Sequence, residues 1–184
     1  MKIFAVYARV KLLKKPDWLD DFRFKYDDRY DFHVTLKQPC FINEEQIPPL
    51  KEKLNQIFSN FYLPDHKINI LFNKKTINNE VEGKACIMIL AKNKDICNLQ
   101  SIIKSSLSDY KNYYESELEK YENNFNPHIT ISRNLDSKTL SMAVSEIKDD
   151  FLCEGTIEEI VLVVVNEKTA EETTNPKNFT VYRL

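Results

Sequence analysis

Two stretches of the sequence share one pattern: residues 31–38 read DFHVTLKQ and residues 127–132 read PHITIS. Each alternates polar and apolar side chains with the period of two that is typical of a half-buried β-strand. His33 and Thr35 therefore share one face of their strand, and His128 and Thr130 share one face of theirs. The two histidines are 95 positions apart (128 − 33), and so are the two threonines (130 − 35). The pattern predicts two equivalent strands, each presenting an imidazole and a hydroxyl.

The chain around these strands has a repeated order of short elements. Hydrophobic periodicity predicts strand, helix, strand, helix, strand twice over, followed by one last strand. The expected strands are residues 2–10, 31–38, 67–72, 84–91, 127–132, 156–165 and 179–184, and the expected helices are 16–24, 44–58, 95–110 and 136–150. This order indicates an internal duplication inside one domain of residues 1–184, with repeat halves of about 1–75 and 84–184. Residues 111–126, charged and rich in tyrosine, fit either an extension of the preceding helix or a lid.

Composition excludes several classes of protein. The 184 residues carry a net charge of -2, whereas proteins that coat long nucleic acids usually have a strong basic excess. A small nucleotide or an RNA end needs only a local basic patch and stays possible. The 2 glycines are too few for a glycine-rich phosphate loop. No apolar run approaches the roughly 20 residues of a membrane helix, and no signal peptide is recognisable at the N-terminus.

The cysteines are scattered and form no C-x-x-C pair; they are Cys40, Cys86, Cys97 and Cys153. Free thiols of this kind suit a reducing, cytoplasmic setting and give no indication of a zinc site. We therefore expect no membrane association, no metal and no cofactor, and a protein that acts as a monomer.

Two imidazoles facing each other across a cleft suit displacement at phosphorus. An unperturbed imidazole titrates near pH 6.5, so one histidine can be neutral while the other is protonated. One then takes a proton from the nucleophile and the other donates one to the leaving oxygen. We expect His33 and His128 to be the catalytic pair. Thr35 and Thr130 would donate hydrogen bonds to the non-bridging phosphate oxygens, where charge builds up in the transition state.

Residues 125–133 (FNPHITISR), together with the first motif, resemble the two-histidine (2H) phosphoesterase superfamily and most closely its 2′-5′ RNA ligase/cyclic phosphodiesterase branch. The resemblance covers nearly the whole chain. It implies a bilobal α+β fold made of duplicated β-α-β-α-β units, with mainly antiparallel sheets facing a central cleft and helices outside. It also implies chemistry without a metal, on 2′,3′-cyclic phosphates or 2′-5′ linkages in RNA or nucleotides. The first motif departs from the branch where Lys37-Gln38-Pro39 stands in place of its usual Phe-Leu-Gly.

Further substrate-binding residues are expected around the motifs. Lys37 and Ser132 share strand parity with the histidine and threonine before them, so both are expected to reach a phosphate. Arg133 matches the arginine that follows the second motif in the family, although strict alternation would point it away from the cleft. Base-stacking candidates are Tyr7, Phe41, Tyr113 and Tyr114. The third histidine, His66, has no threonine two positions later and is expected at the surface.

Two other functions compete with a phosphodiesterase. A non-catalytic module could bind a nucleotide or an RNA end in the same cleft, although binding alone would not require a histidine in both motifs. A metallohydrolase could use both histidines as ligands, but catalytic zinc needs three protein ligands and no H-E-x-x-H motif supplies a third. RNA ligation, the reverse reaction, is a possible side activity.

Overall fold

The computed structural model describes residues 1–27, 30–61, 67–81, 84–148 and 150–184; His66 lies outside them. The strands are β1 (Lys2–Lys14), β2 (His33–Ile42), β3 (Ile68–Val81), β4 (Lys84–Ala91), β5 (His128–Leu135), β6 (Cys153–Val165) and β7 (Phe179–Arg183). The helices are α1 (Trp18–Tyr26), α2 (Ile47–Asn60), α3 (Lys94–Ser106), α4 (Leu118–Asn123), α5 (Ser137–Glu146) and α6 (Ala170–Thr174), with short 3₁₀ turns at Glu44–Gln46 and Pro176–Asn178. The expected strands and helices occur in the expected order, and two short helices that were not expected, α4 and α6, are added to it.

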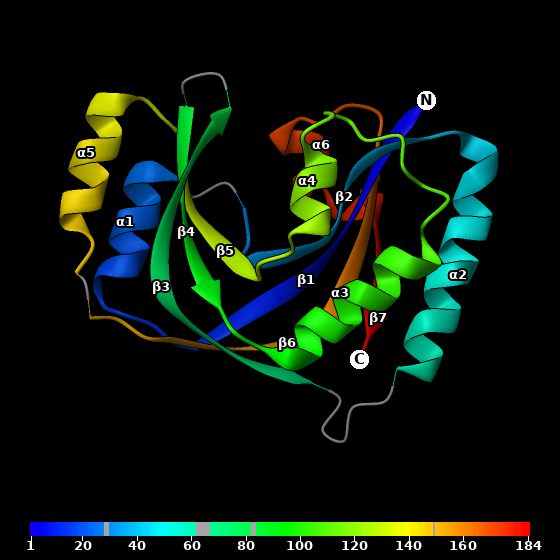
Figure 1. The fold of residues 1–184 in the computed structure, drawn as a ribbon, viewed down its shortest axis with the longest axis horizontal. Helices are drawn as coiled ribbons and strands as arrows, with labels where there is room; N and C mark the ends of the chain where they lie inside the picture. Colours follow the sequence, from blue (N-terminus) through cyan, green and yellow to red (C-terminus); the bar gives the residue numbers. More distant parts are fainter. Residues whose placement is uncertain (28–29, 62–66, 82–83, 149) are drawn as a thin grey trace.

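Across the described residues the strands form one seven-stranded sheet in which every neighbouring pair is antiparallel (Figure 1). Its order is β2-β1-β6-β3-β4-β5, and β7 also pairs with β6. We call β2, β1, β6 and β7 the first arm, and β3, β4 and β5 the second arm. The expected α+β fold is confirmed, but the two expected sheets are arms of one sheet, because β6 pairs with both β1 and β3.

The two strand pairs that carry the motifs have matching registers. In the first arm β1 pairs with β2, and in the second arm β4 pairs with β5, with two irregularities at matching positions in each pair. The matching Cα partners are Phe4↔Cys40, Val6↔Lys37, Tyr7↔Thr35 and Arg9↔His33 against Ala85↔Leu135, Ile87↔Ser132, Met88↔Thr130 and Leu90↔His128. Every β2 residue in this set differs from its β5 equivalent by the 95 positions that separate the two motifs. The two strand pairs therefore share one register and one pattern of irregularities.

The arms do not coincide with the expected halves of the chain at 1–75 and 84–184. The first repeat extends to Val81, because the polar second half of β3 continues the strand by pairing with β4. The last strand of each repeat is exchanged: β3 joins the second arm, and β6 joins the first. Helices are exchanged as well, since α1 contacts β5 while α3 contacts β2. Each arm therefore contains elements from both repeats.

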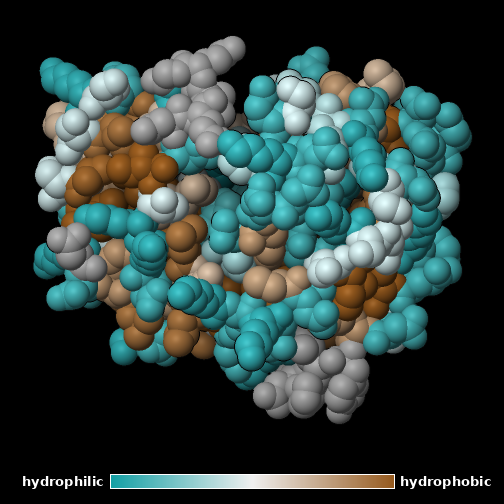
Figure 2. Space-filling model, viewed as in Figure 1, coloured by the Kyte–Doolittle hydropathy of each residue, from teal (hydrophilic) through white to brown (hydrophobic). Residues whose placement is uncertain are grey.

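A shared apolar core holds the helices against the sheet. Alternate residues of β1 point into it, among them Phe4, Val6 and Ala8, which are fully buried. Amphipathic spacing places Leu50 and Leu54 of α2 and Leu99 and Ile103 of α3 in the same core. Burial of apolar side chains such as these is the main contribution to the stability of a domain of this size. In the view of Figure 2 hydrophilic residues dominate the middle of the molecule, while hydrophobic surface gathers at the side that carries α1 and α5.

Residues 111–126 do not extend α3, which ends at Ser106. Backbone hydrogen bonds join Phe41 N to Asn112 O and Tyr114 N to Pro39 O, so this segment runs along the free edge of β2 before it forms α4. Covering an edge strand in this way protects its unpaired backbone groups. Among the described residues, no helix has the length and apolar composition needed to cross a membrane.

Candidate active site

The sheet bends far enough to bring the two motifs together. β2 and β5 lie at opposite ends of the strand order, yet their residues contact each other. His33 and Thr35 are half-buried and alternate with fully buried Val34 and Leu36. The same alternation holds in β5. Each imidazole therefore stands on the face of its strand that points away from the apolar core.

Both imidazoles are held by equivalent hydrogen bonds. The His33 Nδ1 atom lies 2.8 Å from the Asp31 carbonyl oxygen, and the His128 Nδ1 atom lies 2.7 Å from the Asn126 carbonyl oxygen. A carbonyl oxygen only accepts hydrogen bonds, so Nδ1 carries the proton and donates in both cases. This fixes each ring and leaves an Nε2 lone pair on each neutral histidine.

Burial and nearby positive charge lower the pKa of both histidines. For His33, removal from water is the largest cause and lowers the pKa to about 4, with contributions from the positive charges of Arg133, His128 and Arg23; the hydrogen bond to Asp31 opposes them. Burial, then Arg133, also lowers the pKa of His128. Both imidazoles are therefore neutral at pH 7 in the free protein. Because the charge of one affects the other, the two belong to one site.

The residues after each motif do not keep the expected parity. Tyr7 pairs with Thr35 and the adjacent Val6 pairs with Lys37, so one extra residue of β2 forms a β-bulge. The bulge turns Lys37 to the buried face, where 1% of its side chain is exposed and its Nζ atom lies 2.7 Å from Glu122 Oε1. Lys37 as a phosphate ligand was therefore a wrong prediction, because strict alternation stops at the bulge.

The same bulge in β5 turns Ser132 inward. Met88 pairs with Thr130 and the adjacent Ile87 pairs with Ser132. Ser132 is fully buried, and its Oγ atom accepts a hydrogen bond of 3.1 Å from the Ile87 backbone N–H. Ser132 is therefore also not a phosphate ligand. Instead its side chain closes the bulge from inside.

The β5 bulge that turns Ser132 inward also turns Arg133 to the face that carries the histidines. The residue is half-buried, its guanidinium Nε lies 3.0 Å from Asp27 Oδ2, and its positive charge lowers the pKa of both histidines. Asn134 follows with φ of 57°, a left-handed conformation that asparagine tolerates better than most residues. The bulge therefore places Arg133 beside the imidazoles, where strict alternation would have pointed it away.

A family model described as the 2′-5′ RNA ligase superfamily matches residues 9–169. The chain belongs to this superfamily. The matched range contains both His-x-Thr motifs, and the family expected from those motifs is confirmed. No curated protein matches the sequence significantly.

Solved structures with a similar fold cover nearly the whole chain. Usb1 of Kluyveromyces marxianus superposes with a TM-score of 0.55 at 11% identity, covering 99% of this chain and 98% of that one. Its structure with uridine monophosphate gives a TM-score of 0.53 at 11% identity, with coverage of 99% and 98%. A structure described as a phosphoesterase gives 0.53 at 10% identity, covering 100% of this chain and 96% of that one. At these identities the likeness concerns the fold.

Two residues near the site of this superfamily member, Arg23 and Asp27, and one position equivalent to Arg133 in β2, Gln38, were not predicted from the sequence. Arg23 of α1 contributes to the lowered pKa of His33, and its guanidinium lies 4.1 Å from the centre of the Phe32 ring. Asp27 pairs with Arg133, as described above. Gln38 is half-buried and stands 95 positions before Arg133. The offset between the motifs would have identified Gln38, whereas nothing in the sequence links α1 to β5.

One of the four aromatic candidates lies at the histidine pair. The Tyr7 ring centre is 5.0 Å from that of His33 and 6.3 Å from that of Phe179. Phe41 and Tyr114 contact each other, and the Tyr113 hydroxyl donates to Glu122. In the described part of the chain no three His, Cys, Asp or Glu side chains are grouped as metal ligands would be.

Proposed function

We propose that the protein is a metal-independent phosphodiesterase that acts on 2′,3′-cyclic phosphates or 2′-5′ linkages in nucleotides or RNA ends, as a monomer and in the cytoplasm. The observation that carries the proposal is the symmetric pair of imidazoles, each held by a backbone carbonyl at Nδ1, so that Nε2 is the atom left to exchange a proton with a substrate. Two imidazoles on opposite sides of a bound phosphate can act as base and acid. This matches a displacement in which one proton is removed from the nucleophile and one is given to the leaving oxygen.

For a 2′,3′-cyclic phosphate, the two imidazoles carry out both proton transfers. Water attacks phosphorus, one imidazole takes the proton of that water at Nε2, and the other imidazolium gives its proton to the ribose oxygen that leaves. For a 2′-5′ linkage the neighbouring 3′-hydroxyl attacks in place of water, and the 5′-oxygen leaves with the donated proton. The negative phosphate raises the pKa of both imidazoles on binding, so the pair takes up the one proton that the reaction needs.

Thr35, Thr130 and Arg133 would stabilise the phosphate. The two hydroxyls lie two residues from the imidazoles on the same strand faces, where they can donate to the non-bridging oxygens. The guanidinium of Arg133 adds positive charge next to both rings. Usb1, which shares the fold, was solved with uridine monophosphate, and this supports a nucleotide as the substrate here. The four free cysteines suit a reducing compartment.

A substrate panel with product analysis tests this function. Strained cyclic esters and 2′-5′ linkages have lowered barriers or an internal nucleophile, so a site without a metal should act on them and leave p-nitrophenyl phosphate intact. We expect hydrolysis of a 2′,3′-cyclic nucleotide, a 2′-5′ oligoadenylate, or both, with RNA ligation as a slow reverse reaction. Cleavage of p-nitrophenyl phosphate alone would overturn the proposal. Binding of these nucleotides with no turnover of any would support the alternative of a non-catalytic nucleotide- or RNA-end-binding module.

A further inference from the structure

A fully buried ion pair joins β2 to α4 and takes no part in the chemistry above. The Lys37 Nζ atom is 2.7 Å from Glu122 Oε1, and the two side chains are 1% and 3% exposed. Glu122 Oε1 also accepts from the Tyr113 hydroxyl at 3.0 Å, and Glu122 Oε2 accepts from the Gln38 backbone N–H at 3.1 Å. The ammonium group of Lys37 lies 4.7 Å from the centre of the Tyr113 ring. Both carboxylate oxygens are therefore engaged.

The pair joins the two motifs of the site. Lys37 follows His33 by four positions in β2, and Glu122 precedes His128 by six positions at the end of α4, which leads into β5. Through strand pairing, β2 is connected to β5 along the whole order β1, β6, β3 and β4. The Lys37–Glu122 contact bypasses that route. The contact fixes the segment before His128 directly to β2, the strand that carries His33.

Among the described residues of the second arm, the position equivalent to Lys37 makes a different contact. The residue at the position of Lys37 in the duplicated strand is Ser132, whose side chain bonds to Ile87 within its own arm. The Lys37–Glu122 contact thus departs from the symmetry of the two strand pairs. A buried charged pair is a weak source of stability, since an apolar pair of similar volume often serves as well. Its geometry, however, allows little variation in the distance between the groups that it joins.

We propose that Lys37 and Glu122 are positioning residues that set the spacing of the His33 and His128 imidazoles. This inference rests on the proposed function for its effect on turnover. The carboxylate of Glu122 holds the chain just after the β2 bulge through Gln38 and Lys37, while its helix determines where β5 begins. Loss of either charge lets the two strands shift relative to each other. Acid and base then no longer meet the same phosphate, although each imidazole keeps its own carbonyl partner.

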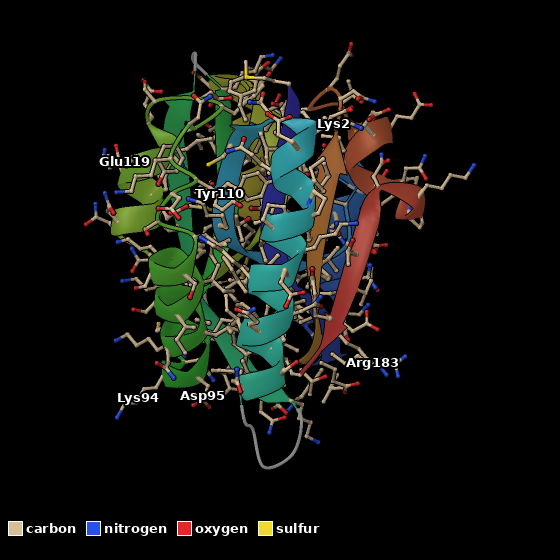
Figure 3. The ribbon with its side chains drawn as sticks, turned by 90° about the vertical axis from the view of Figure 1, so that its right-hand side faces the viewer. Lys2, Lys94, Asp95, Tyr110, Glu119 and Arg183 are labelled. Carbon is tan, nitrogen blue, oxygen red and sulfur yellow. The ribbon has the colours of Figure 1, made fainter. Side chains whose placement is uncertain are left out.

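The test uses Glu122→Gln and Lys37→Met, with Glu119→Gln and Lys94→Met as matched controls. Glu119 lies one turn earlier on α4, Lys94 begins α3, and both residues are exposed and point outward in Figure 3. Misplacement of reacting groups by about 1 Å can cost on the order of 100-fold in rate. We expect kcat on a 2′,3′-cyclic nucleotide to fall roughly 10- to 100-fold in each pair variant while KM changes little. Both controls should keep wild-type kcat.

Folding is separated from positioning by two further measurements. All assays are made well below the melting temperature of each variant, and a double variant, Lys37→Met with Glu122→Leu, replaces the pair by apolar side chains. Restored melting temperature with kcat still low in the double variant supports positioning. Folded single variants with kcat within twofold of the wild type would overturn the proposal. If the wild type turns over no substrate, the proposed function fails, and NMR then tests the positioning role by itself. In Glu122→Gln, a shift of both the His33 and the His128 imidazole signals supports positioning, and unchanged signals overturn it.

Discussion

Titration of the free protein with acid measures the environment of His33 directly. Burial and the charges of Arg133, His128 and Arg23 lower the pKa of His33 to about 4. At pH 7 only about one His33 ring in a thousand would then be protonated, against about one in four for an ordinary imidazole with a pKa near 6.5. The lowered pKa of His128 has burial as its main cause and Arg133 as its electrostatic one. Both rings should therefore titrate below pH 6.5.

The assay is NMR of the imidazole Cε1–H groups, with His33→Gln and His128→Gln assigning the signals. We expect a midpoint near pH 4 for His33, a proton on Nδ1 in the neutral form, and upward movement of both midpoints when a nucleotide product is added. The pH profile of kcat/KM reports the same groups in the free enzyme. The histidine that acts as base must be neutral and the one that acts as acid must be protonated. Activity therefore falls at pH values below and above the two pKa values. Both limbs should then lie below pH 6.5, lower than the range of about 5 to 8 expected from unperturbed imidazoles. A midpoint for His33 at pH 6 or above, or a neutral ring protonated on Nε2, would refute the assigned environment.

The remaining predictions concern cofactor independence, the phosphate contacts and the bulge. Activity should survive excess EDTA, because two imidazoles supply both proton transfers; loss with rescue by zinc or manganese would favour a metallohydrolase instead. Thr35→Ala and Thr130→Ala should each cost about 1–3 kcal/mol of transition-state stabilisation, or about 5- to 150-fold in kcat/KM, as expected for one hydrogen bond to a charged group. Ser132→Ala should reduce the free energy of unfolding by about 1–3 kcal/mol, because the buried Ile87 N–H loses its acceptor. The exposed Ser141→Ala on α5 should change it by less than about 0.5 kcal/mol in the same denaturant titration, and equal effects of the two serine changes would contradict the role of Ser132.

Alternation of polar and apolar residues was sufficient to predict the two motif strands, and hydrophobic periodicity in general predicted the order of most elements. It also predicted that the imidazoles and hydroxyls would share their strand faces, since side chains alternate wherever a strand is regular. The offset of 95 residues between the motifs holds through the register of both strand pairs. These features are local, or repeat at a fixed distance, and such features can be read from one sequence.

The errors at Lys37 and Ser132 have a common physical cause. A β-bulge inserts one residue into one strand and reverses the faces that the following side chains point to. The residue types around Leu36 and Ile131 do not indicate a bulge. The same reversal explains why Arg133 reaches the histidines. The partner of Lys37 is Glu122, 85 positions away, and a contact at that separation depends on how α4 packs against β2.

The extent of β3 and the exchange of elements between arms were hidden for a related reason. Residues 73–81 are largely polar, and only their pairing with β4 makes them a strand. The contact between α1 and β5 depends on the curvature of the whole sheet. Arg23 and Asp27, which both influence the site, reach it through that contact, so their roles follow from tertiary packing alone.

The central claim is that His33 and His128 act together as acid and base on one phosphate. The most direct test is kcat on a 2′,3′-cyclic nucleotide for His33→Ala, His128→Ala and the double variant, with binding of the product nucleotide measured alongside. Each single change should lower kcat by about 10²- to 10⁴-fold, the usual contribution of acid-base catalysis, while the product still binds. The double variant should be little worse than either single one, because the two residues work as a unit. Near-normal turnover in either single variant, with the protein folded, would contradict the shared chemistry.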